Sequence, residues 1–122
     1  ALEILSFLGL SEYQNVSPYG LPYGIKKKIE LARTLMCDPE LIILDEPAAG
    51  LNDKETEELG ETIKVIRDKY HATIFLLEHD MPLVMGISDR IGAINFGKLI
   101  GLGNASEIRN NVAVQSAYLG SE

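Results

Sequence analysis

Two acidic side chains end an apolar run in the segment "LIILDEPAAGLND", which spans residues 41–53. Asp45 and Glu46 follow that run directly. Adjacent carboxylates that leave a strand can serve different partners, because one can hold a hydrated Mg²⁺ while the next polarises an attacking water. A strand that merely ends in solvent is the alternative, and this pattern alone leaves both interpretations open.

A histidine occupies a similar position after a second apolar run, in "ATIFLLEHD". The neutral imidazole of His79 could hydrogen-bond a phosphate or orient a water molecule. For a single histidine after a strand, a structural role is the commoner alternative.

The segment "LPYG", residues 21–24, offers a third kind of chemistry. It precedes an amphipathic stretch, so its free backbone N–H groups and the positive end of a helix dipole would form an anion site. A plain loop of glycine and proline is the alternative.

The elements that must position these residues follow from hydrophobic periodicity and from glycine and proline breakers. In the first part of the chain we expect a helix over 2–8, a loop over 11–24, a helix from Ile25 that ends at 37–40, and a strand at 41–44. A helix with Asn52 or Asp53 as its N-cap should follow, and then a second strand within 72–80. The remaining elements should be a short helix within 81–90, a hairpin that turns near Gly97, and a helical tail. The buried stripes of the two long helices should be Ile25, Ile29, Ala32 and Met36, and Leu59, Ile63, Ile66 and Tyr70.

This alternation of helices and strands predicts an α/β fold with a mainly parallel sheet. In such sheets ligands bind beyond the carboxyl ends of the strands. Asp45 with Glu46, and Glu78 with His79, lie at those ends on two successive strands. The placement favours a ligand site over two unrelated strand ends.

The composition limits the classes of function. The chain has 122 residues, 46% of them hydrophobic and 24% charged, which suits one folded domain or a piece of a larger one. Its formal charge of −7 argues against a nucleic-acid partner, which usually calls for a basic face. No secretory leader is recognisable, and no stretch approaches the ~20 apolar residues of a membrane span.

Together the motifs resemble the C-terminal half of an ATP-binding-cassette ATPase. The segment "LPYGIKKKIELARTLMCDPELIILDEPAAGLN" is similar to the family's signature motif and following helix, its Walker B strand and its D-loop. The segment "TIFLLEHDM" resembles the switch-histidine region. Within the family, "LDEPAAGLN", "EHDMPLVMGISDRI" and the tail "IRNN…AYLG" look most like the ATP-binding subunits of branched-chain amino-acid importers.

The resemblance implies ATP and Mg²⁺ as cofactors and assigns roles to named residues. Asp45 would hold the Mg²⁺ shell, Glu46 would polarise the hydrolytic water, and His79 would sense the γ-phosphate. The signature residues, which would close over ATP bound to a second subunit, are Leu21, Pro22, Tyr23, Gly24 and Ile25. Asn52, in the D-loop, would touch that second subunit.

The signature departs from the usual Leu-Ser-Gly-Gly-Gln. Pro22, Tyr23 and Ile25 replace the serine, the first glycine and the glutamine, and only Ile25 is unusual for the importer branch. The sequence also holds no G-x-x-x-x-G-K-[ST] motif, which the family places well upstream. We therefore expect a C-terminal fragment of a longer subunit, unable by itself to bind Mg-ATP tightly or to hydrolyse it.

The resemblance completes the expected organisation. Residues 1–37 would be part of the helical subdomain with the signature motif, and 38–122 the C-terminal part of the ATPase core. The parent would work as a homo- or heterodimer below integral membrane permease subunits, at the cytoplasmic face of the inner membrane. A cassette for another cargo, such as lipid or lipopolysaccharide, and a non-catalytic interaction module remain the alternatives. The isolated chain should self-associate through uncovered sheet.

Overall fold

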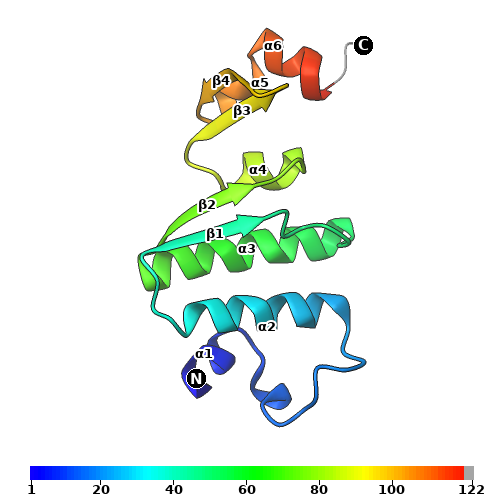
Figure 1. Cartoon of the computed structure of the whole chain (residues 1–122), viewed down its shortest axis with the longest axis vertical. Coiled ribbons are helices and arrows are strands. Elements are labelled where there is room, and N and C mark those ends of the chain that lie inside the picture. The colour runs from blue at the N-terminus through cyan, green and yellow to red at the C-terminus, as the bar shows by residue number, and fades with distance from the viewer. Residues whose placement is uncertain (120–122) are drawn as a thin grey trace. The chain divides into compact units, whose positions relative to one another are not determined.

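The computed structural model describes residues 1–119 and divides the chain into two compact units, 1–79 and 80–122 (Figure 1). Each unit is considered by itself. Gly120 of the tail motif lies outside the described residues. The expected division at residue 37 concerns function rather than compactness, and it stays a prediction.

The first unit is a mixed α/β layer. Its elements are α1 (Leu2–Phe7), a 3₁₀ turn η1 (Ser11–Tyr13), α2 (Tyr23–Leu35), β1 (Leu41–Asp45), α3 (Asp53–Tyr70) and β2 (Thr73–Leu77). β1 and β2 pair in parallel, with Leu41 opposite Thr73 and Asp45 opposite Leu77. The expected parallel pairing is therefore confirmed.

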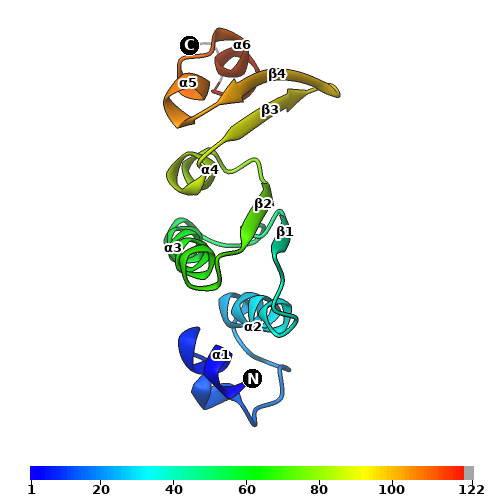
Figure 2. The ribbon, with the colours of Figure 1, turned by 90° about the vertical axis from the view of Figure 1, so that its left-hand side faces the viewer.

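One face of this small sheet is covered and the other is not. α3 lies along one face, as Figure 2 shows, and Ile42 is only 3% exposed. Side chains alternate between the faces of a strand, so the neighbouring Ile43 points the other way and is 63% exposed. A continuous apolar run can belong to a strand that is buried on both faces. Within residues 1–119, the Leu41–Leu44 run is buried on one face only.

α3 begins with a capping box. The Asn52 side chain accepts a hydrogen bond from the Glu55 N–H at 2.8 Å, and the Glu55 carboxylate accepts one from the Asn52 N–H at 3.0 Å. This arrangement satisfies two backbone donors at the helix start. It identifies Asn52, rather than Asp53, as the N-cap.

α2 differs from its prediction in start and buried face. The helix begins at Tyr23, two residues before Ile25, so Tyr23 and Gly24 lie in its first turn instead of in a preceding loop. Its fully buried residues are Leu31, Ala32 and Leu35, whereas Met36, expected on the buried stripe, is 53% exposed. Met36 is the C-cap and keeps helical dihedrals, so its exposure shows that the buried face of α2 runs through Leu31 and Leu35 instead.

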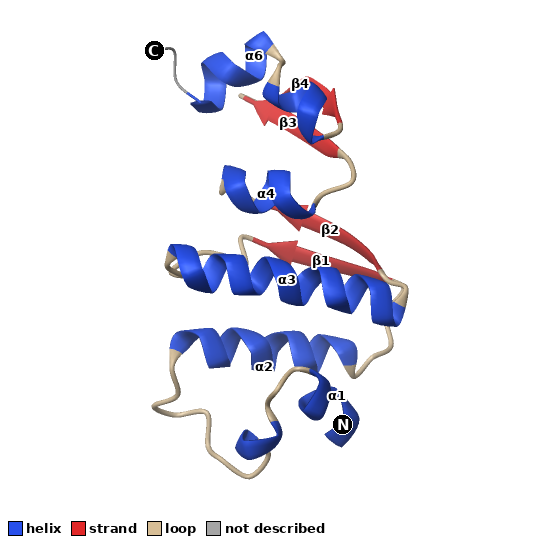
Figure 3. Ribbon diagram, turned by 180° about the vertical axis from the view of Figure 1, so that it is seen from behind, coloured by secondary structure: helices blue, strands red, loops and turns tan. Residues whose placement is uncertain are grey.

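The second unit is a hairpin packed with short helices. Its elements are α4 (Met81–Ile87), β3 (Ile91–Asn95), β4 (Lys98–Gly103), α5 (Ala105–Arg109), α6 (Val112–Val114) and a π-helical turn η2 (Gln115–Leu119), coloured by type in Figure 3. Ile91, Ala93, Ile108 and Val114 form its core. The strands turn through Phe96 and Gly97, both with positive φ, as a tight hairpin requires. The predicted hairpin near Gly97 is confirmed.

Within the described part of the chain, every helix is too short or too polar to cross a membrane.

Candidate functional site

The carboxyl ends of β1 and β2 lie side by side, because the strands are parallel and in register. The pairing runs to Asp45 opposite Leu77, and the Glu46 N–H then donates to the Leu77 carbonyl at 2.8 Å. The residues that follow the strands, Glu46 and His79, consequently leave the sheet at the same edge.

Glu46 and His79 meet at this edge. The Nδ1 atom of His79 lies 3.4 Å from Oε1 of Glu46. The side chains are 74% and 58% exposed, respectively, so the pair contributes little to stability. The same exposure leaves an oxygen base and an imidazole, placed a few ångströms apart, accessible to a ligand.

The backbone of Glu46 is held in an unusual conformation. Its φ of 45° lies in the left-handed region, which costs a residue other than glycine about 1–3 kcal/mol. Hydrogen bonds fix it on both sides: its N–H donates to Leu77, and its carbonyl accepts from the Ala49 N–H at 3.1 Å. Strain that the surrounding structure imposes in this way is typical of functional sites.

Glu78 has a role at this edge that the sequence analysis did not assign. One carboxylate oxygen accepts a hydrogen bond from the Ala48 N–H at 3.2 Å, and the other accepts from the His79 N–H at 3.1 Å. Glu78 therefore ties the turn after β1 to the end of β2. The only signal in the sequence was an acidic residue between an apolar strand and a histidine.

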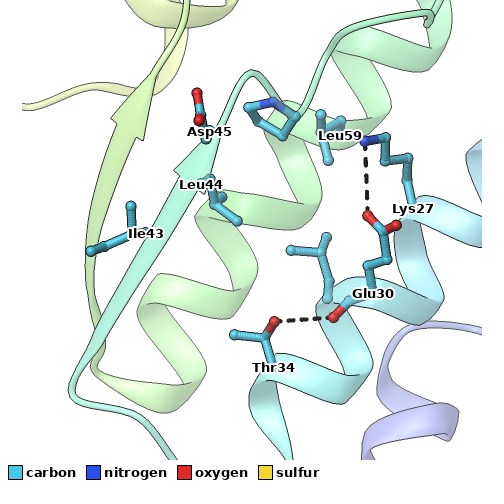
Figure 4. A pocket seen from close by; sticks show the side chains of 9 residues that line it. Lys27, Glu30, Thr34, Ile43, Leu44, Asp45 and Leu59 are labelled. Atoms are coloured by element: carbon cyan, nitrogen blue, oxygen red, sulfur yellow. Dashed lines mark hydrogen bonds and ion pairs between the residues drawn. The ribbon is translucent and has the colours of Figure 1, made fainter.

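Asp45 ends β1 beside a cavity of about 220 Å³. α2 and β1 contribute most of its lining, and Figure 4 shows Lys27 and Glu30 of α2 facing each other, with Asp45 at the end of the strand. The Lys27 Nζ lies 3.8 Å from a Glu30 carboxylate oxygen. Lys27 is thus paired with a carboxylate of its own helix.

The donor set suits Mg²⁺ in one specific way. Asp45 and Glu46 offer exposed carboxylate oxygens, the ligands that Mg²⁺ prefers. No group of three or more histidine, cysteine or acidic side chains that could hold a metal ion occurs within residues 1–119. A protein cage is thus absent there, but Mg²⁺ is usually bound by one or two carboxylates together with water and substrate phosphates. Asp45 fits that arrangement.

The segment from Leu21 to Ile25 leads into α2, which begins at Tyr23. Pro22 is the N-cap and provides no side-chain hydrogen bond to the helix. Tyr23 and Gly24 occupy the first two helical positions, where an N–H group has no acceptor within the helix. These groups and the helix dipole favour an anion at this end.

The start of α2 contacts the loop that leads to Asn52. The Tyr23 ring lies so close to Gly50 that a Cβ placed on the glycine would be 3.1 Å from the Tyr23 Cε1 atom. The site residues thus form two groups: Glu46 with His79 at the strand ends, and Tyr23 with the Gly50 loop before Asn52.

Comparison with known proteins supports the resemblance that the sequence motifs indicate. The family model described as "ABC transporter" matches residues 1–49. The high-affinity branched-chain amino acid transport ATP-binding protein LivG of Salmonella typhimurium is 51% identical over 116 residues, which are 95% of this chain and 46% of that protein. The corresponding protein BraF of Pseudomonas aeruginosa is 46% identical over the same shares.

The fold also matches a solved structure. The ADP conformation of MJ1267, an ATP-binding cassette of an ABC transporter, superimposes with a TM-score of 0.87 at 27% identity, over 98% of this chain and 48% of that one. This chain spans about half the length of the curated relatives that it matches. In its order of motifs, its fold and its identity to LivG, this chain is similar to ATP-binding-cassette (ABC) ATPases.

Proposed function

We propose that this chain is part of an ABC-transporter ATP-binding subunit that hydrolyses ATP to drive the import of branched-chain amino acids. The observation that carries the proposal is the shared strand edge, where Glu46 and His79 lie 3.4 Å apart beside Asp45. The similarity to LivG and BraF supports the choice of cargo.

The residues at the strand ends divide the chemistry of hydrolysis. Asp45 would hold Mg²⁺, which neutralises phosphate charge when bound. Glu46 would accept the proton of the attacking water as a general base. His79, beside Glu46, would hydrogen-bond the γ-phosphate and keep the terminal phosphate in line with that water.

A second subunit would complete the nucleotide site. The start of α2, residues 21–25, would present its N–H groups to ATP on that subunit, and Asn52 would lie at the interface. The contact between Tyr23 and Gly50 supports joint movement of these two segments. The dimer would act at the cytoplasmic face of the membrane, attached through permease subunits.

The bare face of the β1–β2 sheet supports a longer parent. Its large exposed side chains are Leu41, Ile43, Phe75 and Leu77. A parallel sheet is normally covered on both faces. We infer that upstream sequence of the parent, including a P-loop, covers this face, and that residues 1–122 alone do not hydrolyse ATP.

The test uses the full-length subunit reconstituted with its permease. ATP hydrolysis should accompany uptake of labelled leucine, isoleucine or valine, and Glu46→Gln should abolish both. Hydrolysis without uptake of these amino acids would contradict the cargo. Absence of hydrolysis in the unsubstituted complex would contradict the enzyme itself.

A further inference from the structure

We propose that Glu78 is a positioning residue for Glu46 and acts by fastening the turn after β1 to the end of β2. The proposal rests on the proposed function, since it matters for catalysis only if Glu46 is the general base. It is carried by the two hydrogen bonds that the Glu78 carboxylate accepts.

Glu78 is the first residue after β2. The last backbone hydrogen bond between the strand ends joins the Glu46 N–H to the Leu77 carbonyl. Beyond it the chain continues to Pro47 after β1 and to Glu78 and His79 after β2. The Glu78 side chain bridges these two segments by accepting from the Ala48 N–H.

The Ala48 amide needs such an acceptor. Ala48 is buried, and a buried backbone N–H is nearly always paired. A carboxylate has two oxygens, so it can accept from Ala48 and from His79 at the same time, as this one does. Glu78 thus fixes the exits from both strands, the two segments that present Glu46 and His79 to each other.

Loss of this bond would release the conformation of Glu46. Its left-handed backbone is maintained by the turn from Glu46 to Ala49, in which the Ala49 N–H donates to the Glu46 carbonyl. Ala48 lies inside that turn, so freeing its amide loosens the turn on the side of Glu78. The Glu46 carboxylate would then move relative to the attacking water, and a displacement of ~1 Å can cost ~10²-fold in rate.

The kinetic test replaces Glu78 in the full-length subunit. In Glu78→Gln one acceptor oxygen becomes an NH₂ group, so the side chain cannot accept both hydrogen bonds. We expect kcat for ATP hydrolysis to fall by about 10- to 100-fold while KM for ATP changes by less than about threefold. Glu57→Gln, an exposed acid on α3, is the matched control and should leave both unchanged.

A double variant separates positioning from general stability. Once Glu46 is replaced by glutamine, the position of its side chain no longer matters for proton transfer. Glu46→Gln with Glu78→Gln should therefore be as slow as Glu46→Gln alone. A further loss comparable to that of Glu78→Gln alone would overturn the proposal.

A second variant, Glu78→Asp, and hydrogen exchange of the Ala48 amide test the role of Glu78 independently of Glu78→Gln and of ATP hydrolysis. Glu78→Asp keeps the charge but is too short to reach Ala48, and it should reproduce the loss in kcat. Hydrogen exchange of the Ala48 amide should accelerate at least about tenfold in both Glu78 variants, and not in Glu57→Gln. Unchanged exchange, or kcat within about threefold of the parent, would overturn the role of Glu78. An inactive parent with accelerated exchange would instead overturn the proposed function.

Discussion

Glu46 combines an exposed carboxylate with a left-handed backbone that its neighbours enforce. In the full-length subunit, Glu46→Gln should lower the rate of ATP hydrolysis by ~10²–10⁴-fold, because the amide cannot act as a base. Nucleotide binding should survive, and the ATP-bound dimer should persist longer. Glu40→Gln, at the opposite end of β1, is the control and should hydrolyse normally.

The result for Glu46 is decisive in both directions. Steady-state phosphate release measures the rate, and equilibrium binding of labelled ATP shows whether the protein remains folded and competent. Turnover within about threefold of the parent would remove Glu46 from the role of general base, since ~10²-fold is the smallest expected effect.

His79 should matter for turnover but not for folding. Its side chain is largely exposed, so His79→Ala should change the free energy of unfolding by less than ~1 kcal/mol while it slows hydrolysis. His71→Asn is the control, because asparagine tolerates the left-handed conformation of His71, and it should hydrolyse normally. Urea unfolding measures the free energy of unfolding. A loss of several kcal/mol in His79→Ala would indicate a structural histidine instead.

The sequence predicts which residues leave the strands but not how they meet. Asp45, Glu46 and His79 stand out because acids and a histidine follow apolar runs. Their mutual distances depend on the pairing register of two strands that are separated by a whole helix, and no local pattern encodes it. The bridge from Glu78 to Ala48 was invisible for the same reason, since the partner is a backbone amide 30 residues away.

At the scale of elements, Gly50 brings the loop before Asn52 against Tyr23, at the start of α2. Its φ of 80° disfavours any other residue, and a Cβ there would press against the Tyr23 ring. Gly50→Ala should therefore lower the free energy of unfolding by more than the ~1–2 kcal/mol of left-handed strain alone. Chemical denaturation of the full-length subunit measures the loss.

Gly20 provides a matched control for Gly50. Its φ is 82°, yet a Cβ at that position would meet no atom within 4 Å. Gly20→Ala reports the backbone strain, and the excess loss in Gly50→Ala reports the contact with Tyr23. Equal losses in the two variants would show that the Tyr23 ring moves aside freely and that the start of α2 and the loop before Asn52 are not coupled through it.

The element order was predictable because each element carries its own local signal. Asn52 was one of two expected N-caps, and the capping box with Glu55 selects it. The expected face of α2 was partly wrong, since Leu31 and Leu35 are buried and Met36 is exposed. More than one set of apolar residues in α2 has helical spacing, so the sequence alone does not determine the buried face. The elements that pack against the helix determine it.

At the scale of the molecule, the uncovered β1–β2 face should control association. Ile43 and Phe75 are paired in register across the two strands, and both are largely exposed. Exposed apolar sheet tends to recruit another chain. A polypeptide of residues 1–122 should therefore self-associate, and the full-length subunit should lack this tendency if, as proposed, upstream sequence covers the face.

Substitution on the exposed face gives the sharpest test of this expectation. Ile43→Thr with Phe75→Thr keeps strand propensity while it lowers apolar exposure, so it should shift residues 1–122 toward monomer. Val65→Thr is the control, because it also replaces an exposed apolar side chain by threonine, but on α3 and away from this face. It should associate like the parent. Light scattering over a range of concentrations measures the mass. An unsubstituted polypeptide that stays monomeric at high concentration would contradict the argument, because the apolar face of the sheet would then remain exposed to water without causing association.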